Sequence, residues 1–141
     1  MKQKLTKWVY EDPISKDRIY IHVPLIDLFL IMNHKIGNVI KCYLDTGATV
    51  SIFPLEYAVY FLGLSDKTIK NGVVTPVLGV GGVNVSAYGH KCTIQHPSFC
   101  IKNVMVYFLK DQPYPLLGIS GFIDQFKKII IDEEEKTLEL T

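Results

Sequence analysis

The chain has 141 residues, enough for one domain with a hydrophobic core, and 48% of them are hydrophobic against 21% that are charged. This balance is that of a globular protein and excludes an intrinsically disordered one. The 15 Lys and Arg nearly cancel the 14 Asp and Glu, so the net charge of +1 gives no reason to expect nucleic acid or a membrane as a partner.

The N-terminal sequence MKQKLTKWVYEDP lacks the continuous apolar segment of a secretory signal. The longest apolar stretch covers residues 19–32 and is interrupted by His22, Pro24 and Asp27. It is also shorter than the roughly 20 residues that a membrane-spanning helix needs. We therefore expect neither a signal peptide nor a membrane span.

Cysteine and histidine spacing argues against a disulfide framework and a metal site. The three cysteines, Cys42, Cys92 and Cys100, are odd in number and form no CxxC pair. Reduced thiols in a cytoplasmic protein are the better interpretation, although Cys92 and Cys100 can still pair. No histidine has metal-ligand spacing to another His, Cys or carboxylate: His22, His34, His90 and His96. We expect no metal and no other cofactor.

The first predicted elements are strands. Residues 1–18 are open to three interpretations, namely a pro-segment, an extra strand or a disordered arm. Residues 19–23 alternate between aliphatic and polar or aromatic side chains with a period of two, which predicts a strand. The segments LIDLFLIM and NVIKCYL flank the turn-forming NHKIG and predict a hairpin that leads into Asp45.

A short helix and a second hairpin follow. Pro54 can begin a helix through LEYAVYFL, and Gly63 can end it. The segments VVTPVLGV and VNVSAYGHKCTI flank Gly81 and Gly82, which again predicts strand, turn and strand. The segment FCIKNVMVYFL is expected to be another strand.

The C-terminal part is predicted to contain a second helix and a last hairpin. In ISGFIDQF the apolar residues recur at helical spacing, at Ile119, Phe122, Ile123 and Phe126, and should pack into the core. The segments KKIIID and KTLEL flank the acidic turn DEEE. The whole chain is therefore expected to be mostly β, with one or two short helices.

Asp45 is the candidate for chemistry, in the segment CYLDTGATVSIFP. An Asp before a Gly-containing turn is often only a turn residue. Two carboxylates held together share one proton, however, so that one can take a proton from water while the other polarises a carbonyl group. Such a pair needs a tight loop, where Gly47 permits a close approach of backbones and Thr46 can hydrogen-bond across the two loops.

The segment YLDTGATVSIFP resembles the active-site loop of the retropepsin-like aspartic proteases, single-domain enzymes similar to retroviral proteases. The family carries a second motif of two apolar residues and a glycine, which threads past the catalytic loop. Leu116, Leu117 and Gly118 fit this motif, 118 − 45 = 73 residues after Asp45. The glycine-rich VLGVGGVNV lies where the family has its mobile flap, and KKIIIDEEEKTLEL resembles its final strands.

The resemblance implies a closed acid-protease β-barrel over residues 19–141, with a flap hairpin and a ψ-loop that carries the Asp-Thr-Gly motif. It implies that Asp45 is catalytic and that Thr46, Gly47 and Ala48 form the active-site loop. An ordinary hairpin is the alternative to the flap, whose implied residues are Gly79, Val80, Gly81 and Gly82.

Three positions depart from the retroviral pattern. Retroviral members have an Asp pair after Asp-Thr-Gly-Ala and an Arg after the downstream glycine, where this chain has Thr49, Val50 and Ile119. Both ends of that ion pair are replaced, so neither charge is left buried without its partner. The dimer contact of the retroviral enzymes therefore cannot be carried over intact.

Asp45 is the one Asp in the sequence that is followed by Thr-Gly or Ser-Gly. A catalytic pair then needs a second copy of the chain, and a two-fold dimer brings residue 45 to face itself. We expect a homodimeric aspartic endopeptidase that binds an extended peptide as an added strand. The alternatives are a catalytically weak or inactive dimer that binds peptides or acts as a scaffold, and an unrelated β-barrel with an accidental motif.

Overall fold

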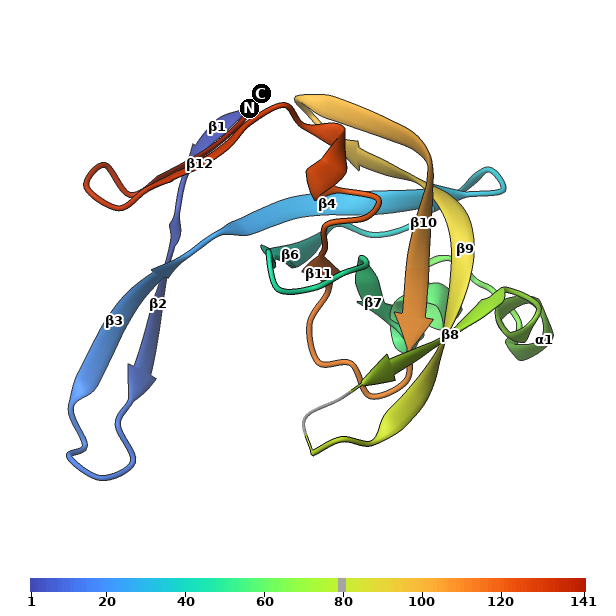
Figure 1. The fold of residues 1–141 in the computed structure, drawn as a ribbon, viewed down its shortest axis with the longest axis horizontal. Helices are drawn as coiled ribbons and strands as arrows, with labels where there is room; N and C mark the ends of the chain where they lie inside the picture. Colours follow the sequence, from blue (N-terminus) through green and yellow to red (C-terminus); the bar gives the residue numbers. More distant parts are fainter. Residues whose placement is uncertain (79–80) are drawn as a thin grey trace.

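The structure is a computed structural model that describes residues 1–78 and 81–141 (Figure 1). The strands are β1 (Lys2–Lys4), β2 (Thr6–Glu11), β3 (Arg18–Val23), β4 (Leu25–Met32), β5 (Lys35–Ile36), β6 (Ile40–Leu44), β7 (Ile52–Pro54), β8 (Val73–Leu78), β9 (Asn84–His96), β10 (Phe99–Leu109), β11 (Leu116–Leu117), β12 (Ile129–Asp132) and β13 (Thr137–Leu140). The helical segments are η1 (Tyr57–Phe61), α1 (Asp66–Lys70) and η2 (Ile123–Gln125). The prediction of a mostly-β chain is confirmed.

Among the described residues, six strands form a closed ring in the order β4, β6, β11, β7, β10, β9 and back to β4. β4 closes it because its first half pairs with β6 and its second half pairs with β9. Ile26, Leu28, Leu30 and Met32 point inward and are buried, as expected of a strand whose side chains alternate. The predicted closed barrel and the hairpin leading into Asp45 are confirmed.

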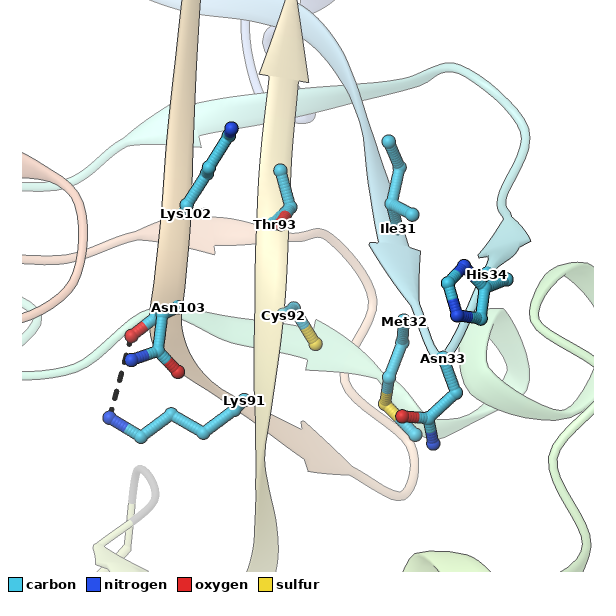
Figure 2. A pocket seen from close by; sticks show the side chains of 9 residues that line it. All are labelled: Ile31, Met32, Asn33, His34, Lys91, Cys92, Thr93, Lys102 and Asn103. Carbon is cyan, nitrogen blue, oxygen red and sulfur yellow. Dashed lines mark hydrogen bonds between the residues drawn. The ribbon is translucent and has the colours of Figure 1, made fainter.

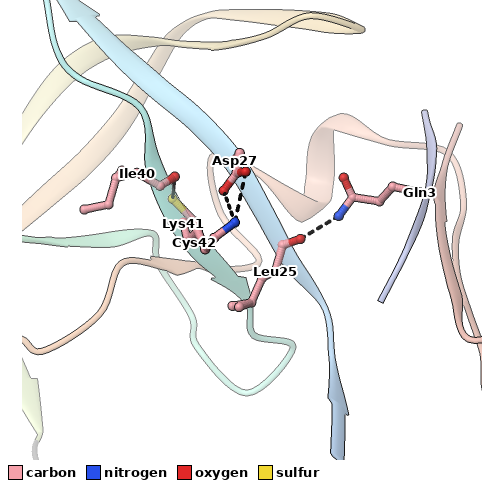
Figure 3. Close-up of polar contacts among 6 residues, drawn as sticks. All are labelled: Gln3, Leu25, Asp27, Ile40, Lys41 and Cys42. Carbon is pink, nitrogen blue, oxygen red and sulfur yellow. Dashed lines mark hydrogen bonds and ion pairs between the residues drawn. The ribbon is translucent and has the colours of Figure 1, made fainter. Parts of the chain in front are cut away.

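Polar contacts join β4 to its neighbours β6 and β1 (Figure 3). Asp27 of β4 lies opposite Lys41 of β6, and Lys41 Nζ lies 3.0 Å from both carboxylate oxygens. Both side chains are exposed, so the pair stabilises the strands by about 1 kcal/mol at most. The Gln3 side-chain amide donates to the Leu25 carbonyl at 2.5 Å, which joins β1 to the start of β4.

The two ends of the chain lie together (Figure 1). β13 pairs with β1 on one side and with β12 on the other, in a three-stranded sheet. The Met1 amine donates to the Leu140 carbonyl at 2.8 Å, and Leu5 is 6% exposed in the main core. The predicted last hairpin is confirmed as β12 and β13.

β2 and β3 pair only with each other among the described strands, with Trp8 opposite Ile21 and Val9 opposite Tyr20. Figure 1 shows this two-stranded ribbon standing away from the barrel. Its turn, residues 12–17, is held by Asp12, whose Oδ1 accepts hydrogen bonds from the Ile14 and Ser15 amides at 2.8 Å. These backbone hydrogen bonds lower the pKa of the Asp12 carboxyl.

The helix predicted to start after Pro54 is present, but its body is a π-helix, with the Leu62 amide bonded to the Tyr57 carbonyl at 3.1 Å. Gly63 follows with φ +63°, which favours glycine. α1 was not predicted, although its cap has a sequence signal in Ser65, whose Oγ accepts a hydrogen bond from the Thr68 amide.

The helix predicted in ISGFIDQF is wrong beyond a single 3₁₀ turn, η2. Gly121 has φ +91° and Phe122 has φ −135°, and neither angle is helical. The spacing arises instead from an aromatic cluster, in which Phe122 and Phe126 pack on Phe99 with ring centroids 5.8 and 5.3 Å away. Phe122 is fully buried as expected, whereas Ile119 is 48% exposed.

All three cysteines are free thiols, so the possible Cys92–Cys100 disulfide is wrong. Cys42 and Cys92 lie in the core, and burial raises the pKa of the Cys92 thiol to about 12, which leaves it unreactive. In the part of the chain that the structure describes, no helix is long and apolar enough to cross a membrane.

Candidate active site

Asp45 follows directly on the last residue of β6, at the start of the loop that leads to β7. Its Oδ1 accepts a hydrogen bond from the Gly47 amide at 2.8 Å, and its carbonyl accepts one from the Ala48 amide at 3.2 Å. The turn chemistry considered for Asp45 is therefore present, and it orients the carboxylate. Thr46 and Gly47 are exposed, and Asp45 itself is half-buried.

β11 threads between the two strands that bracket this loop. Leu116 and Leu117 pair in parallel with the end of β6, and Leu116 pairs antiparallel with Ile52 of β7. The Asp45 amide donates to the Leu117 carbonyl at 3.0 Å. This is the ψ-loop arrangement expected of the Leu-Leu-Gly motif, and it brings together segments more than 70 residues apart.

Gly118 lies where the threaded segment meets the loop most closely. A Cβ atom there would lie 2.3 Å from the Val50 carbonyl oxygen and 2.8 Å from the Ala48 carbonyl oxygen, so no larger residue fits without moving the backbone. Beyond it, the Ile119 and Ser120 amides donate to the Ala48 and Thr49 carbonyls, each at 2.9 Å. The glycine permits this backbone ladder.

Ser51 supports the same contact, which sequence reasoning missed. Its side chain is fully buried, and its Oγ accepts a hydrogen bond from the Gly118 amide at 3.1 Å. Its carbonyl accepts a hydrogen bond from the Tyr107 amide of β10 at 3.0 Å. The available signal was a single polar residue in the apolar run VSIF.

A cavity of about 560 Å³, a typical size for a ligand site, opens in front of Asp45. The loop between β6 and β7 forms one wall through Ala48 and Val50, and β8 forms the opposite wall with residues 75–78. The hairpin predicted from the glycine-rich segment is the β8–β9 pair, and its strand β8 adjoins the cavity.

The turn of this hairpin contains two of the four residues predicted for the flap. Gly81 and Gly82 have φ +94° and +78°, values that favour glycine. Gly79 and Val80, the other two predicted flap residues, lie outside the described residues.

An aromatic cluster includes Tyr43, two residues before Asp45 in the chain, and was not predicted. Trp8 of β2 contacts Tyr43 and Tyr114, with ring centroids 6.1 and 6.2 Å away, and the two tyrosine rings are 5.5 Å apart. Tyr43 lies on β6, whose last residue, Leu44, directly precedes Asp45. Burial, followed by the neighbouring Tyr114, raises the pKa of the Tyr43 hydroxyl.

A second hollow, of about 380 Å³, lies over β4, β9 and β10 and shares no lining residue with the Asp45 cavity (Figure 2). Its polar side chains include Lys91, which donates to the Asn103 carbonyl at 3.4 Å, and Lys102. It contains no carboxylate. Within residues 1–78 and 81–141, no cluster of three or more His, Cys, Asp or Glu side chains could hold a metal ion.

The chain is similar in structure to a retropepsin-like aspartic protease from Rickettsia conorii, with a TM-score of 0.59 and 20% identity over 99% of this chain and 92% of that one. It is also similar to the retroviral protease-like domain of Ddi1 from Leishmania major, with a TM-score of 0.54 and 20% identity over 84% of this chain and 89% of that one. No protein-family model and no curated protein matches the chain. The closed barrel, the ψ-loop and these likenesses establish that the chain has the retropepsin-like fold.

Proposed function

We propose that the protein is an aspartic endopeptidase whose catalytic pair consists of Asp45 from each of two copies of the chain. The observation that carries this proposal is the position of Asp45, on a loop held by the threaded Leu116–Gly118 segment and facing a cavity under the β8–β9 hairpin. Since the sequence has one Asp-Thr-Gly, a two-fold dimer supplies the second carboxylate.

The two Asp45 carboxylates share one proton because they are held close together. The ionised one takes a proton from water as the water oxygen attacks the peptide carbonyl carbon, and the protonated one donates its proton to the carbonyl oxygen. The Asp45 that took the proton from water then gives it to the leaving nitrogen, while the other Asp45 takes a proton from a hydroxyl of the tetrahedral intermediate. The C–N bond breaks as the carbonyl group re-forms, and the pair again shares one proton. No cofactor enters this sequence of steps.

The other site residues hold the geometry and the substrate. Gly47 fixes the carboxylate through its amide, while Thr46 and Ala48 continue the loop that faces the second copy. The β8–β9 hairpin, including Gly81 and Gly82, covers a peptide that lies extended along β8 with alternate side chains in pockets. The free thiols suit a reducing compartment, so we place the enzyme in the cytoplasm.

Peptide-library cleavage between about pH 4 and 7, the range suited to proton-sharing carboxylates, tests the proposal. Asp45→Asn should abolish cleavage, and a pepstatin-like or retroviral-protease inhibitor should block the wild type. Asp27→Asn is the matched control, because it removes an exposed carboxylate from a surface ion pair and should leave cleavage unchanged.

A peptide-binding or scaffold dimer remains the second candidate, because Thr49, Val50 and Ile119 offer no charged contact between copies at the catalytic loop. A wild-type protein that sediments as a dimer, binds peptides and cleaves none of them would favour this second function and refute the first. Cleavage that is present in the wild type and in Asp27→Asn but lost in Asp45→Asn would decide for the enzyme.

A further inference from the structure

The ribbon formed by β2 and β3 has two unlike faces. Residues directly opposite each other in an antiparallel pair share a face, so the register assigns each side chain to one side. One side, called here the apolar face, consists of Thr6, Trp8, Tyr10, Ile19, Ile21 and Val23. The other side carries four polar residues, among them Lys7, whose Nζ lies 4.4 Å from the centre of the Tyr20 ring.

The apolar face is only partly covered by the rest of the chain. Trp8 packs on Tyr43 and Tyr114. Ile21, directly opposite Trp8, is still 41% exposed, and Tyr10, farther out along β2, is 45% exposed. A two-stranded hairpin is marginally stable by itself in water and needs a packed face to persist. Tyr10 and Ile21 of the apolar face therefore lack a covering layer within the described residues of this chain.

The position of the apolar face indicates what covers it. Tyr43 is two residues from Asp45, a distance of about 7 Å along a strand. Figure 1 shows the ribbon leaving the barrel on the same side as the loop between β6 and β7. A second copy that brings its own Asp45 against this one would therefore lie near the cluster of Trp8, Tyr43 and Tyr114, from which the ribbon extends.

We propose that the apolar face of the β2–β3 ribbon packs against the second copy of the chain, so that each copy is held by the other's ribbon. This inference rests on the proposed two-fold dimer and adds the surface that holds it together. The contact is isologous, so each contact made by the apolar face occurs twice in the dimer. It supplies an apolar contact beside a catalytic loop that has no charge at Thr49, Val50 or Ile119.

Sedimentation equilibrium of two double variants tests the proposal. Tyr10→Ser with Ile21→Ser removes the exposed part of the apolar face and should raise the dimer Kd by about tenfold or more. Val9→Ser with Tyr20→Ser is the matched control, because these residues are 46% and 53% exposed on the opposite face of the same ribbon. The control should leave the Kd within about threefold. Equal effects of the two pairs would overturn the proposal.

Photo-crosslinking keeps the test independent of variant stability. A benzoylphenylalanine at position 10 should give a covalent dimer, and one at position 20 should give none. Crosslinks from position 20 alone would contradict the proposal. An unchanged Kd together with a raised KM for long peptides would assign the apolar face to substrate instead, which also overturns it.

The outcome separates this inference from the proposed function, because sedimentation measures assembly without cleavage. A dimer that depends on Tyr10 and Ile21 but cleaves no peptide would refute the endopeptidase and support the ribbon contact. An active enzyme whose Kd is indifferent to both residues would refute the ribbon contact and leave the endopeptidase standing.

Discussion

Gly118 and Ser51 determine where Asp45 can lie, because they set how closely the threaded segment approaches the loop between β6 and β7. The glycine leaves room for the Val50 carbonyl, and the serine hydroxyl accepts the hydrogen bond of the Gly118 amide. The Asp45 amide is bonded to Leu117, next to that contact. A shift of either residue would displace Leu117, and through its hydrogen bond to the Asp45 amide it would move the carboxylate.

Ser51→Ala should lower the free energy of unfolding by about 1–3 kcal/mol, because it leaves the buried Gly118 amide without an acceptor. For peptide cleavage, kcat should fall by a larger factor than KM rises, because the loop loses its geometry while the cavity keeps its walls. Urea unfolding and steady-state kinetics measure both effects. Ser98→Ala, at an exposed serine, is the control, and equal unfolding free energies in the two variants would contradict the account.

The sequence predicted Gly118 but missed the role of Ser51, and the reason is physical. Gly118 belongs to a local motif with its two leucines. The importance of Ser51 lies in a partner 67 residues away, which only the fold brings into contact. The cluster of Trp8, Tyr43 and Tyr114 was missed for the same reason, because its members come from three separate segments.

At the scale of elements, alternation predicted most of the strands, because burial on one face imposes a period of two. The helix in residues 119–126 failed because helical spacing also suits an aromatic cluster at a turn, and Gly121 stops the helix. Residues 1–18 stayed undecided because β1 finds its partner at the far end of the chain, with Lys2 opposite Glu139.

The boundary predicted at residue 19 is testable through Leu5, which lies before it and is buried in the core shared with Leu138 and Leu140. Leu5→Ala should lower the free energy of unfolding by about 2–5 kcal/mol, as for other buried leucines. Thermal or urea unfolding measures this loss, with the exposed Lys4→Ala as control. A Leu5→Ala variant as stable as the wild type would mean that residues 1–18 are a detachable extension.

At the scale of the whole molecule, one chain provides a complete barrel but half of the proposed catalytic pair. The cavity, the ψ-loop and the hairpin over it all lie within one copy. The second carboxylate does not, and neither does the layer proposed to cover the ribbon. Both requirements point to the same two-fold partner, so the assembly is the central claim of this account.

Mixing wild type with Asp45→Asn measures that claim most directly. At equal amounts and above the dimer Kd, random pairing leaves about a quarter of the dimers with two intact carboxylates. After exchange, the account predicts that cleavage falls to about a quarter of the activity of a pure wild-type sample at the same total concentration. A fall to about half would show that each copy cleaves independently, which would contradict a catalytic pair shared between two chains.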